Sequence, residues 1–202
     1  MSSSLWDWTL AQTRDATASA SPTPGGGSIA AISGTFGLSL VVMALEITNK
    51  KAPSDTLASL LAEGRSLLDR LSAHADRDVE LFERYLRAVR LPKATESESA
   101  ARDSALSVAT LEATEAPLMA AADQLSALSY AEPAVAAIQA NVRSDVYAGA
   151  DILLGAVHAS LRNVDINLPH VSDEKQRAVI SARADEIAAQ SRALHARIVP
   201  AR

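Results

Sequence analysis

The chain has 202 residues, of which 48% are hydrophobic and only 3% aromatic, and it contains no cysteine. This length is ordinary for one all-helical domain, and a core of Ala, Leu, Val and Ile lets helices approach one another closely. The lack of cysteine excludes disulfides, cysteine-ligated zinc and thiol catalysis, and it favours the cytoplasm. The formal charge of -5, with acids and bases interspersed, argues against a nucleic-acid partner.

The first quarter of the chain contains a glycine-rich turn between two expected helices. Residues 3–19 are predicted as the first helix, and the run Pro22-Thr-Pro-Gly-Gly-Gly-Ser28 ends it. Ser28 is placed to cap an apolar helix that runs to about Asn49. The uncharged stretch 29–45 approaches the length of a membrane span, but its glycines and serines and its lack of a basic flank favour a buried core helix without membrane association.

The rest of the chain is predicted to be helical. The expected helices cover residues 54–90, 96–129, 133–140, 144–163 and 172–198. Pro117 is expected to kink or restart the second of these. In the last one, Ile180, Ala184 and Ile187 have a near-heptad spacing, which predicts either an internal packing seam or a dimer seam. The prediction is therefore a single all-α domain over residues 1–202, a bundle of long helices around a buried apolar central helix.

The glycine run is the most unusual local feature. Pro24, Gly25, Gly26, Gly27 and Ser28 place a small, permissive backbone at the start of the most apolar helix. Free amide groups and the helix dipole at that point favour an anionic or carbonyl oxygen of a ligand. The alternative is a tight connection between two helices. The run is not a nucleotide-binding P-loop, because no Lys-Ser/Thr follows the glycines.

Two pairs of acidic and polar residues are candidates for chemistry. Asp76 and Asp78 are two residues apart on an expected helix, so they face different directions. Asp78 precedes Phe82 by four residues on an apolar stripe, which is typical either of a partnered acid at a pocket rim or of a solvated helix face. Ser144 and Asp145 suit a polar site, and they equally suit a helix cap.

Two asparagines and the histidines complete the candidates. Asn163 and Asn167 are one helical turn apart and share a face if the helix continues, although amides at helix ends are mostly caps. The four histidines show no metal-ligand spacing, so no metal site is predicted.

Taken in order, several short segments make the chain similar to the formiminotetrahydrofolate cyclodeaminase and methenyltetrahydrofolate cyclohydrolase family. The matching segments are Pro22-Thr-Pro-Gly-Gly-Gly-Ser28, Thr48-Asn-Lys-Lys51, Asp76-Arg-Asp-Val-Glu-Leu-Phe82, Leu91-Pro-Lys93, Ala116-Pro-Leu118, Asn141-Val-Arg-Ser-Asp145 and Asn163-Val-Asp-Ile-Asn-Leu168. Together they span nearly the whole chain. The resemblance implies an all-helical, usually dimeric protein with a folate cleft lined by the glycine loop.

The same resemblance implies a reaction at the one-carbon bridge between nitrogens 5 and 10 of tetrahydrofolate. The expected reaction is the cyclodeaminase one, which releases ammonia, with the cyclohydrolase reaction or folate binding without catalysis as alternatives. The folate is the substrate, and no cofactor is expected.

The implied roles are hypotheses that require the glycine turn and the Ser144–Asp145 pair to converge in space. Asp145 is the first choice for the acid/base group and Asp78 the second. The residues expected to orient the pterin are Asn141, Ser144, Asn163 and Asn167, and those expected to meet the glutamate tail are Lys50, Lys51 or Lys93.

Overall fold

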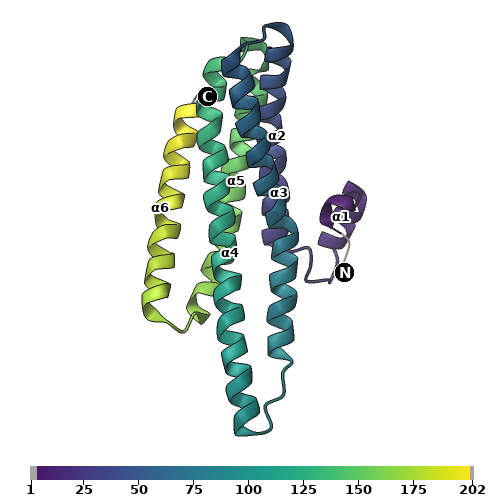
Figure 1. The fold of residues 1–202 in the computed structure, drawn as a ribbon, viewed down its shortest axis with the longest axis vertical. Helices are drawn as coiled ribbons and strands as arrows, with labels where there is room; N and C mark the ends of the chain where they lie inside the picture. The colour runs from purple at the N-terminus through teal and green to yellow at the C-terminus, as the bar shows by residue number, and fades with distance from the viewer. Residues whose placement is uncertain (1–3, 201–202) are drawn as a thin grey trace.

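The computed structural model describes residues 4–200, and its long helices run alternately up and down one bundle (Figure 1). In chain order the elements are η1 (Leu5–Asp7), α1 (Leu10–Thr17), α2 (Gly26–Lys51), α3 (Asp55–Val89), α4 (Glu96–Ala137), η2 (Ala140–Val142), α5 (Arg143–Asn167), η3 (Leu168–His170) and α6 (Glu174–Ile198). No strand occurs between residues 4 and 200. The prediction of an all-α bundle of long helices is confirmed.

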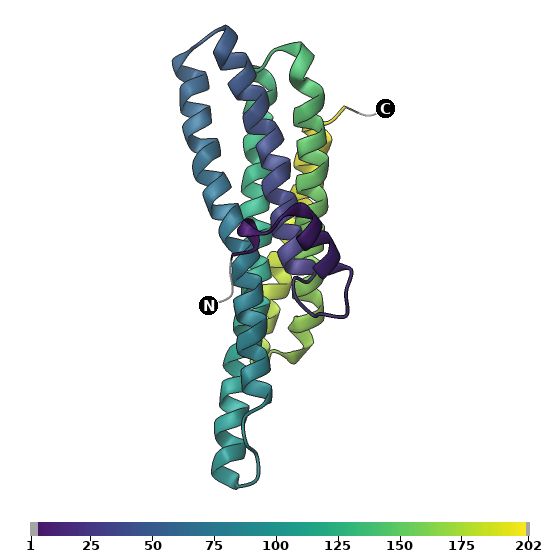
Figure 2. The ribbon, with the colours of Figure 1, turned by 90° about the vertical axis from the view of Figure 1, so that its right-hand side faces the viewer.

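Four helices surround the main core. Helix α2 packs against α3 and α5, and α4 closes the ring by packing against the same two helices. Helix α6 lies over α4 and α5 on the outside. The hairpin made by the end of α3 and the start of α4 extends well beyond the other helices, and the short α1 lies apart from the bundle axis beside α2 (Figures 1 and 2).

Side-chain caps define where the long helices begin. The hydroxyl of Ser54 accepts a hydrogen bond from the amide of Leu57 at the start of α3. Thr95 and Glu98 form a capping box at the start of α4, in which each side chain accepts from the other residue's amide. Helix α2 is different, because its N-cap is Gly25 and no side chain of its own caps it.

Helix α4 continues through Pro117 and Pro133 as one element. Of the kink or restart expected at the first proline, the restart is therefore wrong, and the separate helix predicted after the second proline is wrong as well. A proline removes one backbone hydrogen bond from a helix interior, but burial on several sides outweighs that local loss here. Pro117, Ala120 and Ala121 are buried, and α4 packs against α3, α5 and α6.

Small residues let the backbones of α2 and α5 meet. A Cβ on Gly149 would lie 2.5 Å from the carbonyl oxygen of Gly37, so only glycine permits this crossing. Helix α2 is the one element among residues 4–200 long and apolar enough to cross a membrane, and 61% of its most apolar window is buried inside the bundle. This burial is typical of a core helix.

The N-terminal segment is docked on the outside of α2 and α3. The predicted single helix over residues 3–19 is instead η1 and α1, with Thr9 capping α1 between them. The indole nitrogen of Trp6 donates to the carbonyl of Ser72 at 2.9 Å, and its ring meets Phe36 edge-on with centroids 6.1 Å apart. Leu5 is buried against Ala31 and Ala75.

The regular spacing in α6 serves internal packing. Ile180, Ala184 and Ile187 are buried in a cluster that α4 and α5 complete. Of the two interpretations of this spacing, the packing seam is therefore correct, and these side chains are not free to form a dimer seam.

Candidate active site

The glycine turn is seated on α3 by one carboxylate. Oδ2 of Asp78 accepts two hydrogen bonds from Ser28, from the amide at 2.8 Å and from the hydroxyl at 2.7 Å. Ser28 is the third residue of α2, so Asp78 caps that helix from a neighbouring helix and interacts favourably with its dipole. The backbone amide of Ser28, which was expected to donate to an oxygen of a ligand, thus donates to a side chain of the protein itself.

Gly27 is required for this arrangement. A Cβ at this position would lie 2.7 Å from Cγ of Asp78, so the carboxylate could not stay where it is. Oδ1 of Asp78 accepts from no residue between 4 and 200. The turn therefore holds Oδ2 of Asp78 and leaves Oδ1 without a donor in the described part of the chain.

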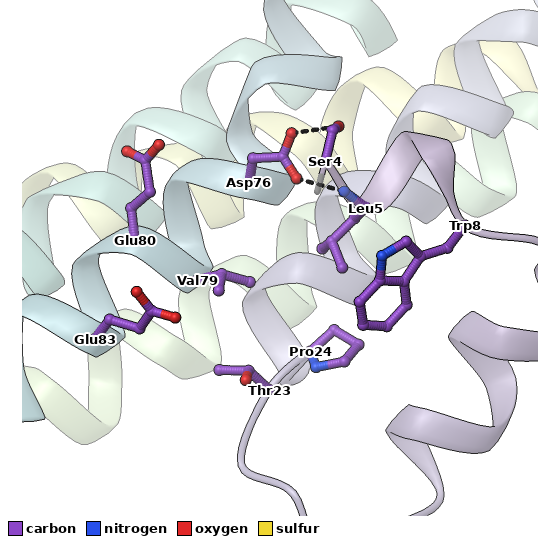
Figure 3. A pocket seen from close by; sticks show the side chains of 9 residues that line it. All are labelled: Ser4, Leu5, Trp8, Thr23, Pro24, Asp76, Val79, Glu80 and Glu83. Atoms are coloured by element: carbon purple, nitrogen blue, oxygen red, sulfur yellow. Dashed lines mark hydrogen bonds between the residues drawn. The ribbon is translucent and has the colours of Figure 1, made fainter. Parts of the chain in front are cut away.

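Asp76 points elsewhere, as the two-residue spacing predicted. Its carboxylate accepts from the hydroxyl of Ser4 at 2.6 Å and from the amide of Leu5 at 2.7 Å, as Figure 3 shows. It borders a cavity of about 260 Å³ between α3 and the N-terminal segment, with Pro24 on the opposite wall. Asp76 has a structural role, since it fixes the N-terminal segment to α3.

Asp78 borders a different cleft, which is larger, with a volume of about 340 Å³. Its lining comes from α3, α4, α5 and η3, and the residues are Asp78, Leu81, Phe82, Tyr85, Thr110, Ala113, Ala116, Pro117, Asn163, Ile166, Asn167 and His170. Such a mixture of apolar walls and a few convergent polar groups is typical of a small-molecule site. Three of the predicted site residues, Asp78, Asn163 and Asn167, thus share one cleft.

The two asparagines are held by their amide nitrogens. Nδ2 of Asn163 donates to the carbonyl of Ala159 at 3.0 Å, and a Cβ on Gly26 would touch the same side chain at 3.6 Å. Nδ2 of Asn167 donates to the carbonyl of Ala113 at 2.8 Å. Both amide oxygens are without a donor among residues 4–200 and remain available to the cleft.

The other predicted site residues lie elsewhere. Asn141 lies in η2, and Ser144 and Asp145 are in the first turn of α5. The 18 residues from Asp145 to Asn163 correspond to about 27 Å of helix. The predicted convergence of the Ser144–Asp145 pair with the glycine turn is therefore wrong within one chain. The physical reason is that both ends belong to straight helices, α2 and α5, which pack antiparallel along their length.

The predicted tail-binding lysines are also remote from the cleft. Lys50 and Lys51 end α2, about 33 Å along its axis from Ser28, and Lys51 donates to Gln139 at 3.3 Å. Lys93 is exposed at the tip of the α3–α4 hairpin, more than about 16 Å beyond Asp78. None of the three lines the 340 Å³ cleft.

Comparison with known sequences and structures places the chain in a family. The model of the formiminotransferase-cyclodeaminase family matches residues 9–186. The chain belongs to this family. It is 36% identical over 158 residues to a methenyltetrahydrofolate cyclohydrolase of Methylorubrum extorquens, a match that covers 76% of this chain and 74% of the relative.

Two further proteins are similar to this chain, one of them longer and the other with a known structure. It is 31% identical over 159 residues to the formimidoyltransferase-cyclodeaminase of Gallus gallus, covering 77% of this chain but only 29% of that protein. Its fold is similar to that of a formiminotetrahydrofolate cyclodeaminase from Thermotoga maritima, with a TM-score of 0.83 at 24% identity over 96% of this chain and 94% of the other.

The sequence interpretation of this family member missed three cleft residues, Tyr85, Thr110 and His170. A signal for Tyr85 was present, because it follows Asp78 by seven residues and Phe82 by three, and that spacing puts all three on one helix face. Thr110 and His170 had no such signal, since they come from a helix and a turn that only the tertiary structure brings to α3.

Proposed function

We propose that this protein is a folate enzyme that acts on the one-carbon bridge between nitrogens 5 and 10 of tetrahydrofolate. One observation carries the proposal: Asp78, whose Oδ1 has no hydrogen-bond donor among residues 4–200, lines a 340 Å³ cleft together with Asn163 and Asn167. The family membership supports the substrate class. Asp78 replaces Asp145 as the proposed acid/base group, because Asp145 lies at the far end of α5.

The cleft suits a pterin ring in both shape and polarity. Phe82 and Tyr85 offer aromatic surface to a flat heterocycle. The pterin pyrimidine ring carries amino and ring N–H donors, and the free oxygens of Asn163 and Asn167 are acceptors one helical turn apart. These two amides orient the ring, and the one-carbon unit then lies toward Asp78.

The first candidate reaction is the cyclodeaminase one. Nitrogen 10 attacks the formimino carbon and loses its proton to Asp78, which gives a tetrahedral carbon bonded to three nitrogens. The former imino nitrogen acquires the N10 proton from Asp78 and one further proton from outside, so it leaves as ammonia and the cationic methenyl bridge remains. A carboxylate beside the bridge also stabilises the positive charge that develops there.

The second candidate, hydrolysis of the methenyl bridge, is favoured by the 36% identity to a cyclohydrolase of comparable length. Water adds to the cationic carbon as Asp78 accepts one of its protons. The second water proton is lost as the formyl group forms on nitrogen 10, and the bond to nitrogen 5 breaks with protonation of that nitrogen. One proton leaves the site in each turnover.

An absorbance assay of 5,10-methenyltetrahydrofolate, run from both the formimino and the methenyl substrate, tests the proposal. We expect turnover by the wild type, a loss of about 10²-fold or more in kcat for Asp78→Asn, and less than about a twofold change for the matched variant Asp145→Asn. Full turnover by folded Asp78→Asn excludes the acid/base role. Loss of turnover in Asp145→Asn alone restores the first assignment from sequence.

Titration calorimetry with folinic acid separates an enzyme from a protein that only binds folate. Binding without turnover of either substrate supports the non-catalytic alternative, and absence of binding excludes a folate function. The full reaction sequence of the longer relatives does not transfer, since this chain spans 29% of the length of one of them.

We further propose that the protein is a cytoplasmic homodimer that binds neither nucleic acid nor membranes. Phe36 and Met43 on α2 and Ile152 on α5 are 47%, 39% and 37% exposed on neighbouring helices, and they suit a second copy of the chain. Sedimentation of the wild type and of Met43→Glu tests this, with the monomer expected only for the variant.

A further inference from the structure

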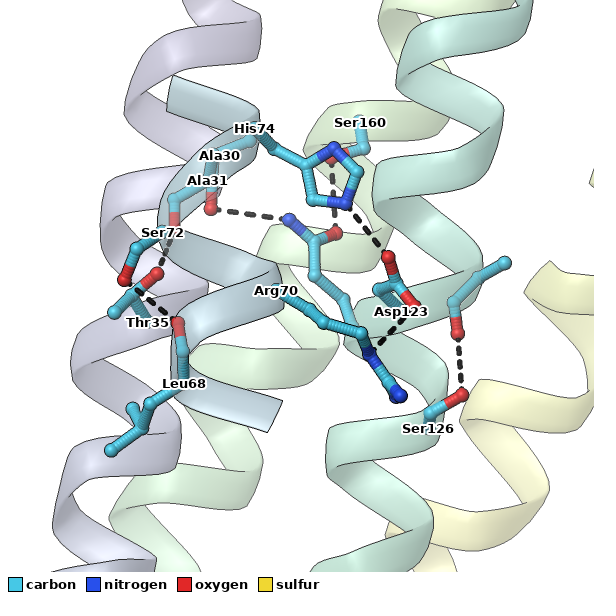
Figure 4. Close-up of polar contacts among 12 residues, drawn as sticks. Ala30, Ala31, Thr35, Leu68, Arg70, Ser72, His74, Asp123, Ser126 and Ser160 are labelled. Atoms are coloured by element: carbon cyan, nitrogen blue, oxygen red, sulfur yellow. Dashed lines mark hydrogen bonds and ion pairs between the residues drawn. The ribbon is translucent and has the colours of Figure 1, made fainter. Parts of the chain in front are cut away.

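We infer that His74, held by Asp123, relays protons to and from Asp78 and so acts as a positioning residue of the proposed reaction. The inference rests on the proposed function. His74 precedes Asp78 by one turn of α3, so both side chains are on the same face of that helix. The ring is 15% exposed, and its Nε2 lies 2.8 Å from Oδ2 of Asp123 on α4 (Figure 4).

The partners of Asp123 fix the orientation of the imidazole. Arg70, one turn before His74 on α3, lies 3.6 Å from the other oxygen of Asp123. Figure 4 shows Arg70 and His74 on either side of this carboxylate. A carboxylate that holds Nε2–H defines the neutral tautomer and leaves Nδ1 as the acceptor, the arrangement by which an acid positions an imidazole base.

A small cavity joins His74 to the proposed catalytic group. Its volume is about 20 Å³, and its polar lining residues are His74, Asp78, Arg77 and Ser160, with Gly27 beside them. That space and those polar partners suit one water molecule. Asp78 and Pro117 border both this cavity and the larger cleft, so Asp78 separates the substrate side from the His74 side.

The proposed reactions explain why such a group is needed. Hydrolysis releases one proton per turnover, and deamination of the neutral formimino group takes one up. Asp78 returns the proton that it accepts from nitrogen 10, and it has one free oxygen for the substrate, because Ser28 occupies the other. An imidazole can both accept and donate a proton, so His74 supplies or removes the net proton through a water molecule in this cavity.

The alternative is that the pair only ties α3 to α4. The chain contains a matched pair for this comparison, because Nε2 of His195 on α6 lies 2.6 Å from Asp151 on α5. Neither of these residues lines the cleft or the small cavity. Removing the His195–Asp151 contact therefore shows how far the loss of a histidine–aspartate contact between helices changes activity when no catalytic residue is nearby.

The experiment compares His74→Gln and Asp123→Asn with His195→Gln in the same absorbance assay. We expect kcat to fall at least about tenfold in the first two, with KM within about twofold of wild type, and both constants to be unchanged in the third. In His74→Gly, added imidazole is expected to restore kcat in a concentration-dependent way. Melting temperatures show that each variant is folded, and Asp123→Asn keeps the test available if His74→Gln fails to fold.

Two results overturn the relay. One is wild-type kcat in folded His74→Gln or folded Asp123→Asn. The other is a fall in the kcat of His74→Gly that added imidazole does not reverse and that is matched by an equal fall in His195→Gln. A wild-type protein without turnover of either substrate overturns the proposed function and the relay together, whereas an active wild type with active His74 variants overturns the relay alone.

Discussion

Asn167 donates a hydrogen bond to the carbonyl oxygen of Ala113 at 2.8 Å, and this carbonyl is the one that Pro117 leaves without its helical partner. A proline has no N–H, so the carbonyl four residues earlier loses its donor. The side chain from α5 supplies the donor instead. The same contact holds Asn167 at the cleft, so the hydrogen bond that α4 lacks at Pro117 and the polar edge of the site depend on each other.

This relationship predicts a coupling between two substitutions. Asn167→Ala is expected to lower the free energy of unfolding by about 1–3 kcal/mol, because a half-buried carbonyl loses its donor. In a Pro117→Ala background the restored amide supplies that donor, so the same substitution is expected to cost less than half as much. Urea unfolding of the four proteins measures the difference, and equal costs in both backgrounds contradict the prediction. Asn141→Ala, at an exposed asparagine, is the control, with a change within about 0.5 kcal/mol.

Gly27→Ala is expected to displace Asp78 from Ser28. The added Cβ would lie 2.7 Å from Cγ of Asp78, so the carboxylate must move and the helix cap is lost. We expect a loss of about 1–3 kcal/mol in stability and a fall in kcat. Gly155→Ala is the matched control, because no atom lies within 4 Å of its added Cβ, and there the helix gains about 0.5–1 kcal/mol. Wild-type kcat in Gly27→Ala argues against a catalytic role of this contact.

Gly149→Ala is expected to force α2 and α5 apart. Its Cβ would lie 2.5 Å from the carbonyl oxygen of Gly37 and 3.1 Å from Val41, and backbone atoms of two long helices cannot yield locally. The expected loss is about 1–3 kcal/mol or more, measured by thermal or urea unfolding against the same Gly155→Ala control. Unchanged stability would show that the two helices separate without cost.

The pKa of His158 predicts a pH dependence of stability. Burial, and then the charges of Arg192 and Arg162, lower its pKa below the ordinary value of 6.5, and its Nε2 is buried without a partner among residues 4–200. Because the unfolded chain binds the proton more tightly, the free energy of unfolding is expected to fall as the pH decreases through about 6.5. The contribution is complete above that pH. His158→Gln is expected to weaken this decline, as measured by melting temperatures between pH 7.5 and 5.5.

Exposed His170 provides the control for that experiment. His170→Gln is expected to leave the decline of the melting temperature as in the wild type. An identical decline in the wild type and His158→Gln would mean that other groups determine the acid sensitivity.

The helical bundle was predictable from local pattern, because apolar side chains at three-to-four spacing indicate the buried face of each helix wherever that helix packs. The start of α3 at Asp55 follows from the cap Ser54, and its end at Val89 follows from Leu91-Pro92. The prolines in α4 were the exception, since a local rule that ends a helix was outweighed by packing on several sides.

Residue type alone identified some of the polar residues of the candidate site, but it did not show which of the candidates lie together. Asp78, Asn163 and Asn167 were recognised as polar residues at unusual positions and do share the cleft. Asp145 and the lysines were equally plausible by type. They lie outside the cleft because residues far apart along one straight helix are also far apart in space. In α5, Asp145 and Asn163 are separated by about 27 Å.

The amino-acid sequence by itself determined which segments are helical, which faces are apolar and that a glycine turn precedes α2, since these depend on short-range spacing and backbone freedom. Only the tertiary structure decided that the amide of Ser28 in the turn donates to Asp78 rather than to a ligand. It also decided that His74 and Asp78 line one small cavity. Contacts between helices depend on which ends meet in an antiparallel bundle, and no local pattern encodes that meeting.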